Sequence, residues 1–168
     1  MLKICYNKKK VIVGVNMKKP LNNCITIRRM AERDVGSVAQ IEVECFLHPW
    51  SEAALAAELG KPRCDFFVAE LEGEIAGYIG TYITLDECSV ANVAVSCRFR
   101  RLGIGRSLVE HALKNAADNA CSAIYLEVRQ SNLPAISLYS SLGFEKLAVR
   151  KRFYTEPDED ALVMSRSL

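Results

Sequence analysis

Hydrophobic residues in this chain recur with two different periods, and the change from one to the other separates predicted strands from predicted helices. Ile25 and Ile27 alternate with polar neighbours, which predicts a first strand. Apolar residues between positions 35 and 46 fall at helical spacing, and residues 47–60 are typical of a loop leading into a second helix capped by Ser51. The pattern therefore predicts one strand followed by two helices.

Three hydrophobic runs follow within residues 65–95. A turn at Gly73 separates the first two runs, and a second turn near Asp86 and Glu87 separates the last two. Runs of this length, joined by short turns, predict three strands of an antiparallel meander.

The helical period returns after Gly105 and places several apolar residues on one helix face. Residues 123–129 then predict a strand, and residues 133–144 predict a short helix. The final stretch predicts two closing strands joined by the acidic turn 155–160. The apolar residues on the face of the first of these helices are Leu108, Ala112, Leu113 and Ala116.

This order of elements predicts an α/β domain with a mixed, mostly antiparallel central sheet flanked by helices. One parallel pair of strands is expected, joined through the helix after Gly105. We assign residues 24–168 to this domain. Residues 1–23 contain six lysines and no acidic residue, and we expect them to form a flexible extension outside it.

Composition argues against several function classes. The formal net charge of +2 gives no support for binding nucleic acid through its phosphates, and no apolar run approaches the roughly 20 residues needed to cross a bilayer. The seven cysteines are dispersed and form no C-x-x-C pair, which argues against a zinc site or a disulfide framework. Dispersed cysteines suit a reducing compartment, so we expect a cytoplasmic protein without a bound metal.

A basic, glycine-spaced turn runs straight into a helix over residues 98–113, "RFRRLGIGRSLVEHAL". The first backbone N–H groups of a helix lack partners and carry the positive end of its dipole, and glycines let a ligand approach them closely. The local pattern leaves two interpretations open: a cradle for a phosphate group, or an ordinary turn with solvated arginines. The arginines around the two glycines are Arg98, Arg100, Arg101 and Arg106.

Two motifs together carry a resemblance to a known family. Residues 100–105, "RRLGIG", fit the pyrophosphate-loop pattern of the GNAT superfamily of N-acetyltransferases. Together with "HPWS" and "LDECSVANVAV", residues 126–144, "LEVRQSNLPAISLYSSLGF", resemble its ribosomal-protein-alanine N-acetyltransferases. The resemblance covers residues 25–164 and implies the GNAT fold. It also implies that the anion held by the turn is the pyrophosphate of acetyl-coenzyme A, which serves as co-substrate without a metal.

The same resemblance implies roles for individual residues. The proposed general base of the family corresponds to Glu127, and the proposed general acid corresponds to Tyr139. The resemblance also implies three groups of contacts with acetyl-coenzyme A. The strand segment whose backbone pairs with the pantetheine arm corresponds to Val93, Ala94 and Val95. The pyrophosphate loop corresponds to Arg101, Leu102, Gly103, Ile104, Gly105 and Arg106, and a cofactor-contacting asparagine corresponds to Asn132.

Both catalytic assignments have a structural alternative. On its predicted strand, Glu127 shares a face with Tyr125 and Arg129. Its carboxylate either pairs with Arg129 on an exposed face, or removes the proton that keeps an amine from attacking a thioester. Tyr139 either fills the core or donates a proton to the departing coenzyme A thiolate, for which a phenol pKa of about 10 is suitable.

Recognition of the acceptor is expected from two loops. One is the "HPWS" loop around Trp50, which either lines a groove or fills the core, and the other follows Tyr154 and contains the acidic run 156–160. We expect His48 and His111 to be structural. The acidic turn at residues 86–87 either attracts a cationic substrate or is simply solvated.

The resemblance implies an N-acetyltransferase that moves an acetyl group from acetyl-coenzyme A to the N-terminal α-amine of a ribosomal protein, with alanine as the acceptor residue. Transfer is expected to be direct, within a ternary complex, by a monomer or weak dimer that contacts neither nucleic acid nor membrane. Two alternatives stay open. One is acetylation of a lysine side chain or a small-molecule amine, and the other is an acyl-coenzyme A-binding module without catalysis.

Overall fold

The predicted order of strands and helices is present in the structure, a computed structural model that describes residues 3–4 and 25–168. Two short 3-10 helices and a two-residue strand are added to that order. The strands are β1 (Lys3–Ile4), β2 (Thr26–Arg29), β3 (Cys64–Leu71), β4 (Glu74–Thr84), β5 (Glu87–Val95), β6 (Ala123–Arg129), β7 (Glu145–Thr155) and β8 (Asp158–Ser167). The helices are η1 (Glu32–Asp34), α1 (Val35–Cys45), α2 (Glu52–Glu58), η2 (Cys97–Phe99), α3 (Ile104–Asp118) and α4 (Leu133–Ser141).

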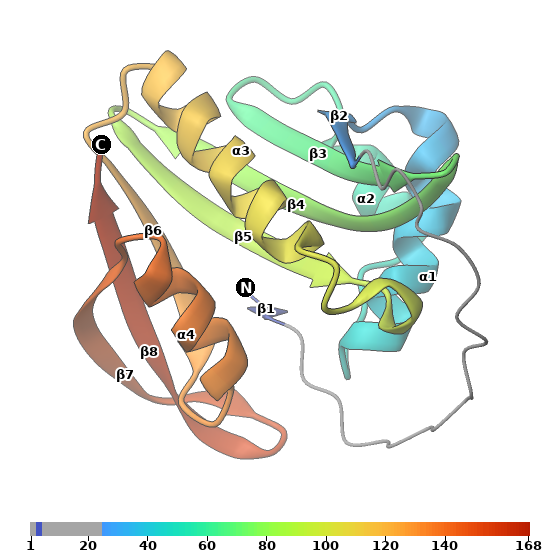
Figure 1. Ribbon diagram of the computed structural model, residues 1–168. Helices are drawn as coiled ribbons and strands as arrows, with labels where there is room; N and C mark the ends of the chain where they lie inside the picture. Colours follow the sequence, from blue (N-terminus) through green and yellow to red (C-terminus); the bar gives the residue numbers. More distant parts are fainter. Residues whose placement is uncertain (1–2, 5–24) are drawn as a thin grey trace.

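All eight strands belong to one mixed sheet, in which seven follow the order β2-β3-β4-β5-β6-β8-β7 and β1 pairs with β5 outside this order. Within the order, all neighbouring pairs are antiparallel except β5 and β6, which run parallel and are joined through α3. Helices α1 and α2 cover one face of the sheet, and α3 and α4 cover the other (Figure 1). The predicted mixed, mostly antiparallel sheet flanked by helices is therefore confirmed.

Two apolar layers hold the helices on the sheet. On the α3 side, the layer contains all four residues predicted for the apolar face of this helix, and each of them is buried. On the other side, α1 packs against β3 and β4 around Val38, Phe66 and Tyr78. Because burying apolar surface contributes about 25 cal/mol per Å², these two layers are the main source of stability.

Residues at the ends of the elements also behave as predicted. Ser51 is the N-cap of α2, and its Oγ accepts a hydrogen bond from the backbone N–H of Ala54 at 3.2 Å. Gly73 connects β3 to β4 with a φ of +83°, in the left-handed region that glycine adopts without strain. Local sequence signals therefore determine where these elements stop and start.

Strands β5 and β6 pair only at their starts. The parallel register joins residues 87–89 of β5 to residues 123–125 of β6, and beyond this point the two strands separate (Figure 1). Strand β1 lies between them and pairs in parallel with β5 at Asn92 and Val93. Apart from this strand, the extension predicted for residues 1–23 lies outside the residues that the structure describes. The candidate site residues of β5 and β6 lie beyond the point where the two strands separate.

Candidate active site

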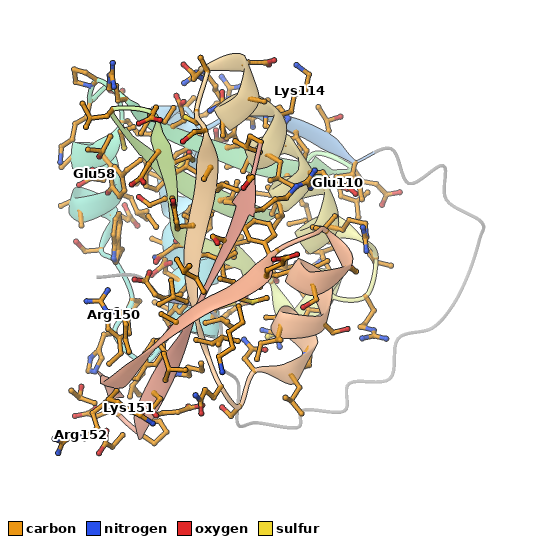
Figure 2. The ribbon with its side chains drawn as sticks, turned by 90° about the vertical axis from the view of Figure 1, so that its left-hand side faces the viewer. Glu58, Glu110, Lys114, Arg150, Lys151 and Arg152 are labelled. Carbon is orange, nitrogen blue, oxygen red and sulfur yellow. The ribbon has the colours of Figure 1, made fainter. Side chains whose placement is uncertain are left out.

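Glu127 lies on β6 beyond the point where β5 leaves it. The residue is only 8% exposed, so this face of the strand is covered rather than open to solvent. Its Oε1 accepts a hydrogen bond from Nη1 of Arg150 on β7 at 2.7 Å, and the arginine, labelled in Figure 2, is more than half exposed. The alternative of an exposed ion pair between Glu127 and Arg129 is wrong, because Arg129 is engaged by other groups.

Arg129 holds the β7–β8 turn against β6. Its guanidinium donates to the backbone carbonyls of Glu156 at 2.8 Å and Pro157 at 3.1 Å, and it pairs with Glu159 at 3.1 Å. Burial opposes ionisation of Glu159, yet hydrogen bonds from the N–H of Ser131 and from Arg129 lower the pKa of this carboxyl. The acidic run is therefore part of a fixed structure and not merely a solvated charge cluster.

Tyr154 is a candidate site residue that sequence reasoning missed. The guanidinium of Arg129 lies 4.0 Å from the centre of its ring, and the residue is 6% exposed. Within the described residues, its hydroxyl is buried and has no hydrogen-bond partner. Burial raises the pKa of this phenol, so the hydroxyl keeps its proton and can donate it to a ligand. No local pattern distinguishes Tyr154 from an ordinary core tyrosine.

Tyr139 lies on α4 and is 2% exposed. Its ring packs edge-on against Phe144 with 5.8 Å between the ring centres. The ring therefore fills the core, as one of the two interpretations expected. The role of its hydroxyl as a proton donor stays a prediction.

The segment predicted to pair with pantetheine is the end of β5. Val93 packs in the α3-side layer and Ala94 in the α1-side layer, so their side chains alternate across the sheet. The carbonyl of Val95 accepts hydrogen bonds from Nε of Arg100 at 3.4 Å and from Sγ of Cys45 at 3.5 Å. The backbone of this segment borders the region where β5 and β6 diverge, and at Val93 it is paired with β1.

The predicted pyrophosphate loop is the start of α3. Gly103 is the N-cap with a φ of +84°, and a Cβ placed on it would meet no atom within 4 Å. A Cβ on Gly105 would make ordinary contacts, 3.6 Å from Leu138 and 3.8 Å from Val95. The conformation therefore requires glycine at the first position, while the second has room for alanine. The helix start is open to an incoming anion.

Two of the four arginines near this loop are engaged elsewhere. Arg98 pairs with Glu74 at 3.0 Å, and Arg100 donates to the carbonyl of Val95. Arg106 stays at the helix start, where it donates to Oγ of Ser141 at 2.6 Å. The positive charge is therefore less concentrated around the glycines than the sequence suggests.

Asn132, the remaining predicted cofactor residue, is the N-cap of α4. Its side chain accepts a hydrogen bond from the N–H of Ala135 at 3.3 Å. This local bond gives the residue a structural role in starting the helix. Its predicted contact with acetyl-coenzyme A stays a prediction.

The two loops predicted to recognise the acceptor meet in the structure. Nε2 of His48 in the "HPWS" loop lies 3.5 Å from Oε2 of Glu156 in the β7–β8 turn, and both side chains are more than half exposed. The half-buried ring of Trp50 packs near Phe66, 6.1 Å between ring centres. Glu87, in contrast, lies at the opposite end of β5 and accepts a hydrogen bond from Tyr125, which favours the interpretation of a solvated turn.

Comparison with known proteins identifies the family of this chain. A model described as the acetyltransferase (GNAT) family matches residues 35–144, more than half of the chain. The chain belongs to the GNAT acetyltransferase family.

Similar curated proteins and solved structures include the following matches. The ribosomal protein bS18-alanine N-acetyltransferase of Escherichia coli K12 is 34% identical over 142 residues, which is 83% of this chain and 95% of that protein. The crystal structure of the E. coli ribosomal-protein-S18-alanine N-acetyltransferase matches with a TM-score of 0.78 and 34% identity, over 85% of this chain and 93% of that one. The structure of Ard1 from Thermoplasma volcanium matches with a TM-score of 0.77 and 27% identity, over 86% and 97%.

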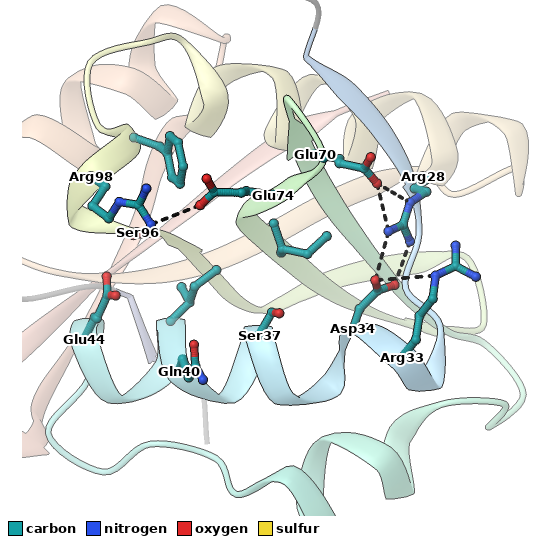
Figure 3. A pocket seen from close by; sticks show the side chains of 14 residues that line it. Arg28, Arg33, Asp34, Ser37, Gln40, Glu44, Glu70, Glu74, Ser96 and Arg98 are labelled. Atoms are coloured by element: carbon teal, nitrogen blue, oxygen red, sulfur yellow. Dashed lines mark hydrogen bonds and ion pairs between the residues drawn. The ribbon is translucent and has the colours of Figure 1, made fainter.

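The acetyltransferase also has a hollow of about 580 Å³ on the α1 side, beside the β3–β4 turn (Figure 3). Its charged walls are already paired: Arg28 binds Asp34 at 2.6 Å and Glu70 at 3.0 Å, and Arg98 binds Glu74. Hydrogen bonds and charge from Arg28 lower the pKa of Asp34 even though burial opposes this. None of the predicted catalytic or cofactor residues lines this hollow, so we do not assign the reaction to it.

Two further features of the acetyltransferase concern metals and membranes. Among the described residues, no three His, Cys, Asp or Glu side chains are grouped so that they could hold a metal ion. In the same part of the chain, no helix is long and apolar enough to cross a membrane.

Proposed function

We propose that this acetyltransferase moves an acetyl group from acetyl-coenzyme A to the N-terminal α-amine of a ribosomal protein that begins with alanine, in the cytoplasm. One observation carries the proposal: the buried carboxylate of Glu127 already holds a cationic group, the guanidinium of Arg150, at 2.7 Å. Because that arginine is more than half exposed, it can move aside for the ammonium group of a substrate. A carboxylate in this position both attracts the amine and can accept its proton.

The residues near β5 and α3 fit acetyl-coenzyme A. The backbone of Val93, Ala94 and Val95 would pair with the pantetheine arm, and the exposed helix start at Gly103 would hold the pyrophosphate. Support for the second contact comes from the open space around Gly103 and from its left-handed conformation, which turns the chain into the helix. Arg101, Leu102, Ile104, Gly105, Arg106 and Asn132 complete the set that we propose to contact the co-substrate.

The proposed chemistry is direct transfer. Glu127 takes a proton from the ammonium group, directly or through a water molecule, and the free amine attacks the thioester carbonyl carbon. A backbone N–H near Val93 stabilises the negative oxygen that forms. When the carbon–sulfur bond breaks, Tyr139 donates its proton to the departing thiolate. The nitrogen gives up its second proton, which returns to the Tyr139 oxygen directly or through water, and the neutral amide is released.

Three considerations favour an α-amine as the acceptor. The α-amine has an ordinary pKa of about 7.7–8.0 against about 10.4 for lysine, so one carboxylate can complete its deprotonation near neutral pH. The buried hydroxyl of Tyr154, which lacks a partner among the described residues, is placed beside the β7–β8 turn, where it can bind the first peptide group of the acceptor. The 34% identical relative is named for acetylating the alanine of ribosomal protein bS18.

The decisive experiment uses two matched peptides with free and blocked N-termini. Both begin with alanine and contain internal lysines, and mass spectrometry locates the acetyl group after incubation with acetyl-coenzyme A. We expect acetylation of the free N-terminus and little transfer to the blocked peptide. Transfer mainly to lysines would overturn the assignment of an N-terminal acceptor but would still show acetyltransferase activity. Binding of acetyl-coenzyme A without transfer to any amine would favour a non-catalytic module.

A further inference from the structure

Glu42 on α1 is a completely buried acidic residue, far in sequence from the residues assigned to the reaction. Its Oε2 accepts a hydrogen bond from the backbone N–H of Trp50 at 2.8 Å. Its Oε1 accepts one from the side-chain amide of Asn92 at 2.9 Å and another from the hydroxyl of Tyr78. Burying a carboxylate is costly unless such donors compensate it. One carboxylate thus joins α1 to β4, β5 and the "HPWS" loop.

Two of these donors also bond to each other in the apolar layer beneath α1, where Glu42, Asn92 and Tyr78 form a polar cluster. The amide of Asn92 also donates to Oη of Tyr78 at 3.1 Å, and both residues are completely buried. Burial, with the nearby charge of Glu42, raises the pKa of Tyr78 well above its usual value. The phenol therefore remains a donor over the whole physiological range, and the cluster keeps one arrangement.

The position of this cluster relates it to the two substrates. Asn92 directly precedes Val93, in the segment of β5 proposed to contact pantetheine, and the bulge between Gly80 and Thr81 lies opposite it. Trp50 lies two positions after His48, and the His48 side chain contacts the carboxylate of Glu156 in the β7–β8 turn. Glu42 therefore bonds at one oxygen to the strand proposed for the co-substrate and at the other to the loop proposed for the acceptor.

We propose that Glu42 is a positioning residue that sets the "HPWS" loop, residues 48–51, at a fixed distance from β5 and thereby places the acceptor relative to the thioester. This inference rests on the proposed function. The loop between α1 and α2 has no regular structure of its own, and Leu47 beside it is largely exposed. Phe46 anchors its first residue in the α1-side core, and His48 contacts Glu156 at the surface. Trp50 is held by its ring on Phe66 and by its N–H on Glu42, and loss of the bond to Glu42 is expected to let residues 48–51 shift.

The test compares variants that damage the same cluster in different ways. Glu42→Met keeps the length of the side chain and removes the acceptor of the Trp50 N–H. Tyr78→Phe removes a hydroxyl from the cluster and leaves the bond to Trp50 intact. Glu42→Gln is the conservative variant, because one amide oxygen can still accept from Trp50. We expect Glu42→Met to lose more thermal stability than Tyr78→Phe, because it leaves the three donors around the buried carboxylate without their acceptor, so the kinetics are compared at a temperature at which both variants are folded.

Steady-state kinetics separate positioning from stability. For Glu42→Met we expect the KM of the acceptor peptide to rise about tenfold, as for the loss of one hydrogen bond of about 1.4 kcal/mol, with acetyl-coenzyme A affinity within about twofold of the wild type. Tyr78→Phe should leave the acceptor KM near the wild-type value, and Glu42→Gln should restore most of it. Equal KM values for Glu42→Met and the wild type, or equal increases for Glu42→Met and Tyr78→Phe, would overturn the proposal.

A second readout needs no acceptor. Trp50 is the only tryptophan of the chain, so its fluorescence reports on the loop directly. Quenching by acrylamide should increase in Glu42→Met and not in Tyr78→Phe. If Glu42→Met does not fold, Glu42→Asp, which is shorter by one methylene, replaces it with the same expectations. Absence of transfer by the wild type would count against the proposed function, whereas unchanged quenching in the folded Glu42 variant would count against the positioning role.

Discussion

The guanidinium of Arg150 on β7 reaches across β8 to donate a hydrogen bond to the carboxylate of Glu127 on β6. The two residues lie on strands that are not neighbours, and the arginine keeps more than half of its side chain in solvent while the glutamate is almost covered. The pair is therefore asymmetric: the carboxylate is covered on its strand, whereas the guanidinium is more than half exposed and lies 4.5 Å from the ring centre of Phe153. Under the proposed function, an arriving ammonium group takes the place of the guanidinium.

Glu127→Gln tests the base. The variant keeps the shape of the side chain and removes its ability to accept a proton, so we expect turnover at neutral pH to fall roughly 10²–10⁴-fold with acetyl-coenzyme A affinity retained. Turnover should partly recover as the pH rises through about 8, because more of the substrate α-amine is then already neutral. A pH–rate profile against the wild type measures both effects. Unchanged turnover at every pH would make Glu127 a structural residue.

Gly103 tests the pyrophosphate contact. Aspartate and asparagine have nearly the same shape and both tolerate positive φ better than most residues, so Gly103→Asp and Gly103→Asn share the backbone strain and differ in charge. We expect the aspartate variant to bind acetyl-coenzyme A about tenfold or more weakly than the asparagine variant, because its carboxylate repels the phosphates. Calorimetric titration decides the matter. Equal affinities of the two folded variants would contradict the proposal that the start of α3 binds the pyrophosphate.

Tyr139→Phe tests the acid. The ring packs against Phe144 and remains in the variant, so we expect only a small change in melting temperature and a reduced turnover. The matched control is Tyr125→Phe, which deletes a hydroxyl that bonds to Glu87 at the far end of β6 and should leave turnover unchanged. Comparable rates for wild type and Tyr139→Phe would leave Tyr139 with its packing role alone.

Sequence patterns predicted the parts of this molecule that depend on near neighbours. The strand and helix order and the cap at Ser51 follow from residues within a few positions of one another. The helical period predicts a helix after Gly105, whereas α3 begins at Ile104 with Gly103 as its N-cap. The two faces of β6 were also predicted, since alternation alone separates Glu127 from Leu126 and Val128. Such features need no knowledge of tertiary contacts.

The partners of these residues could not be predicted, because they come from distant parts of the chain. Arg150 lies 23 positions from Glu127 and reaches it only because β8 returns between β6 and β7. Asn92 lies 50 positions from Glu42, and the buried cluster that joins them has no sequence signature. Charge and polarity patterns identify candidates, whereas register and topology decide which candidates meet.

The final prediction concerns the N-terminal segment. Strand β1 pairs with β5 at Asn92 and Val93, at the start of the segment that we propose to contact pantetheine. A chain that begins at Met17 lacks β1, which among the described residues contributes two residues of backbone pairing beside seven longer strands. We therefore expect it to melt within a few degrees of the full chain and to bind acetyl-coenzyme A at least as tightly.

The full-length variant Ile4→Pro is the matched control for this truncation. It retains the six lysines of residues 1–23 but removes a backbone donor and hinders pairing with β5. An effect of β1 itself should therefore appear in both proteins. An effect of the basic charge should appear only in the truncated protein. Thermal melts and calorimetric titration with acetyl-coenzyme A measure the two properties side by side. Weaker binding in both proteins would mean that β1 supports the conformation of β5. A large loss of stability in the shorter chain alone would mean that other residues before Met17 belong to the folded domain.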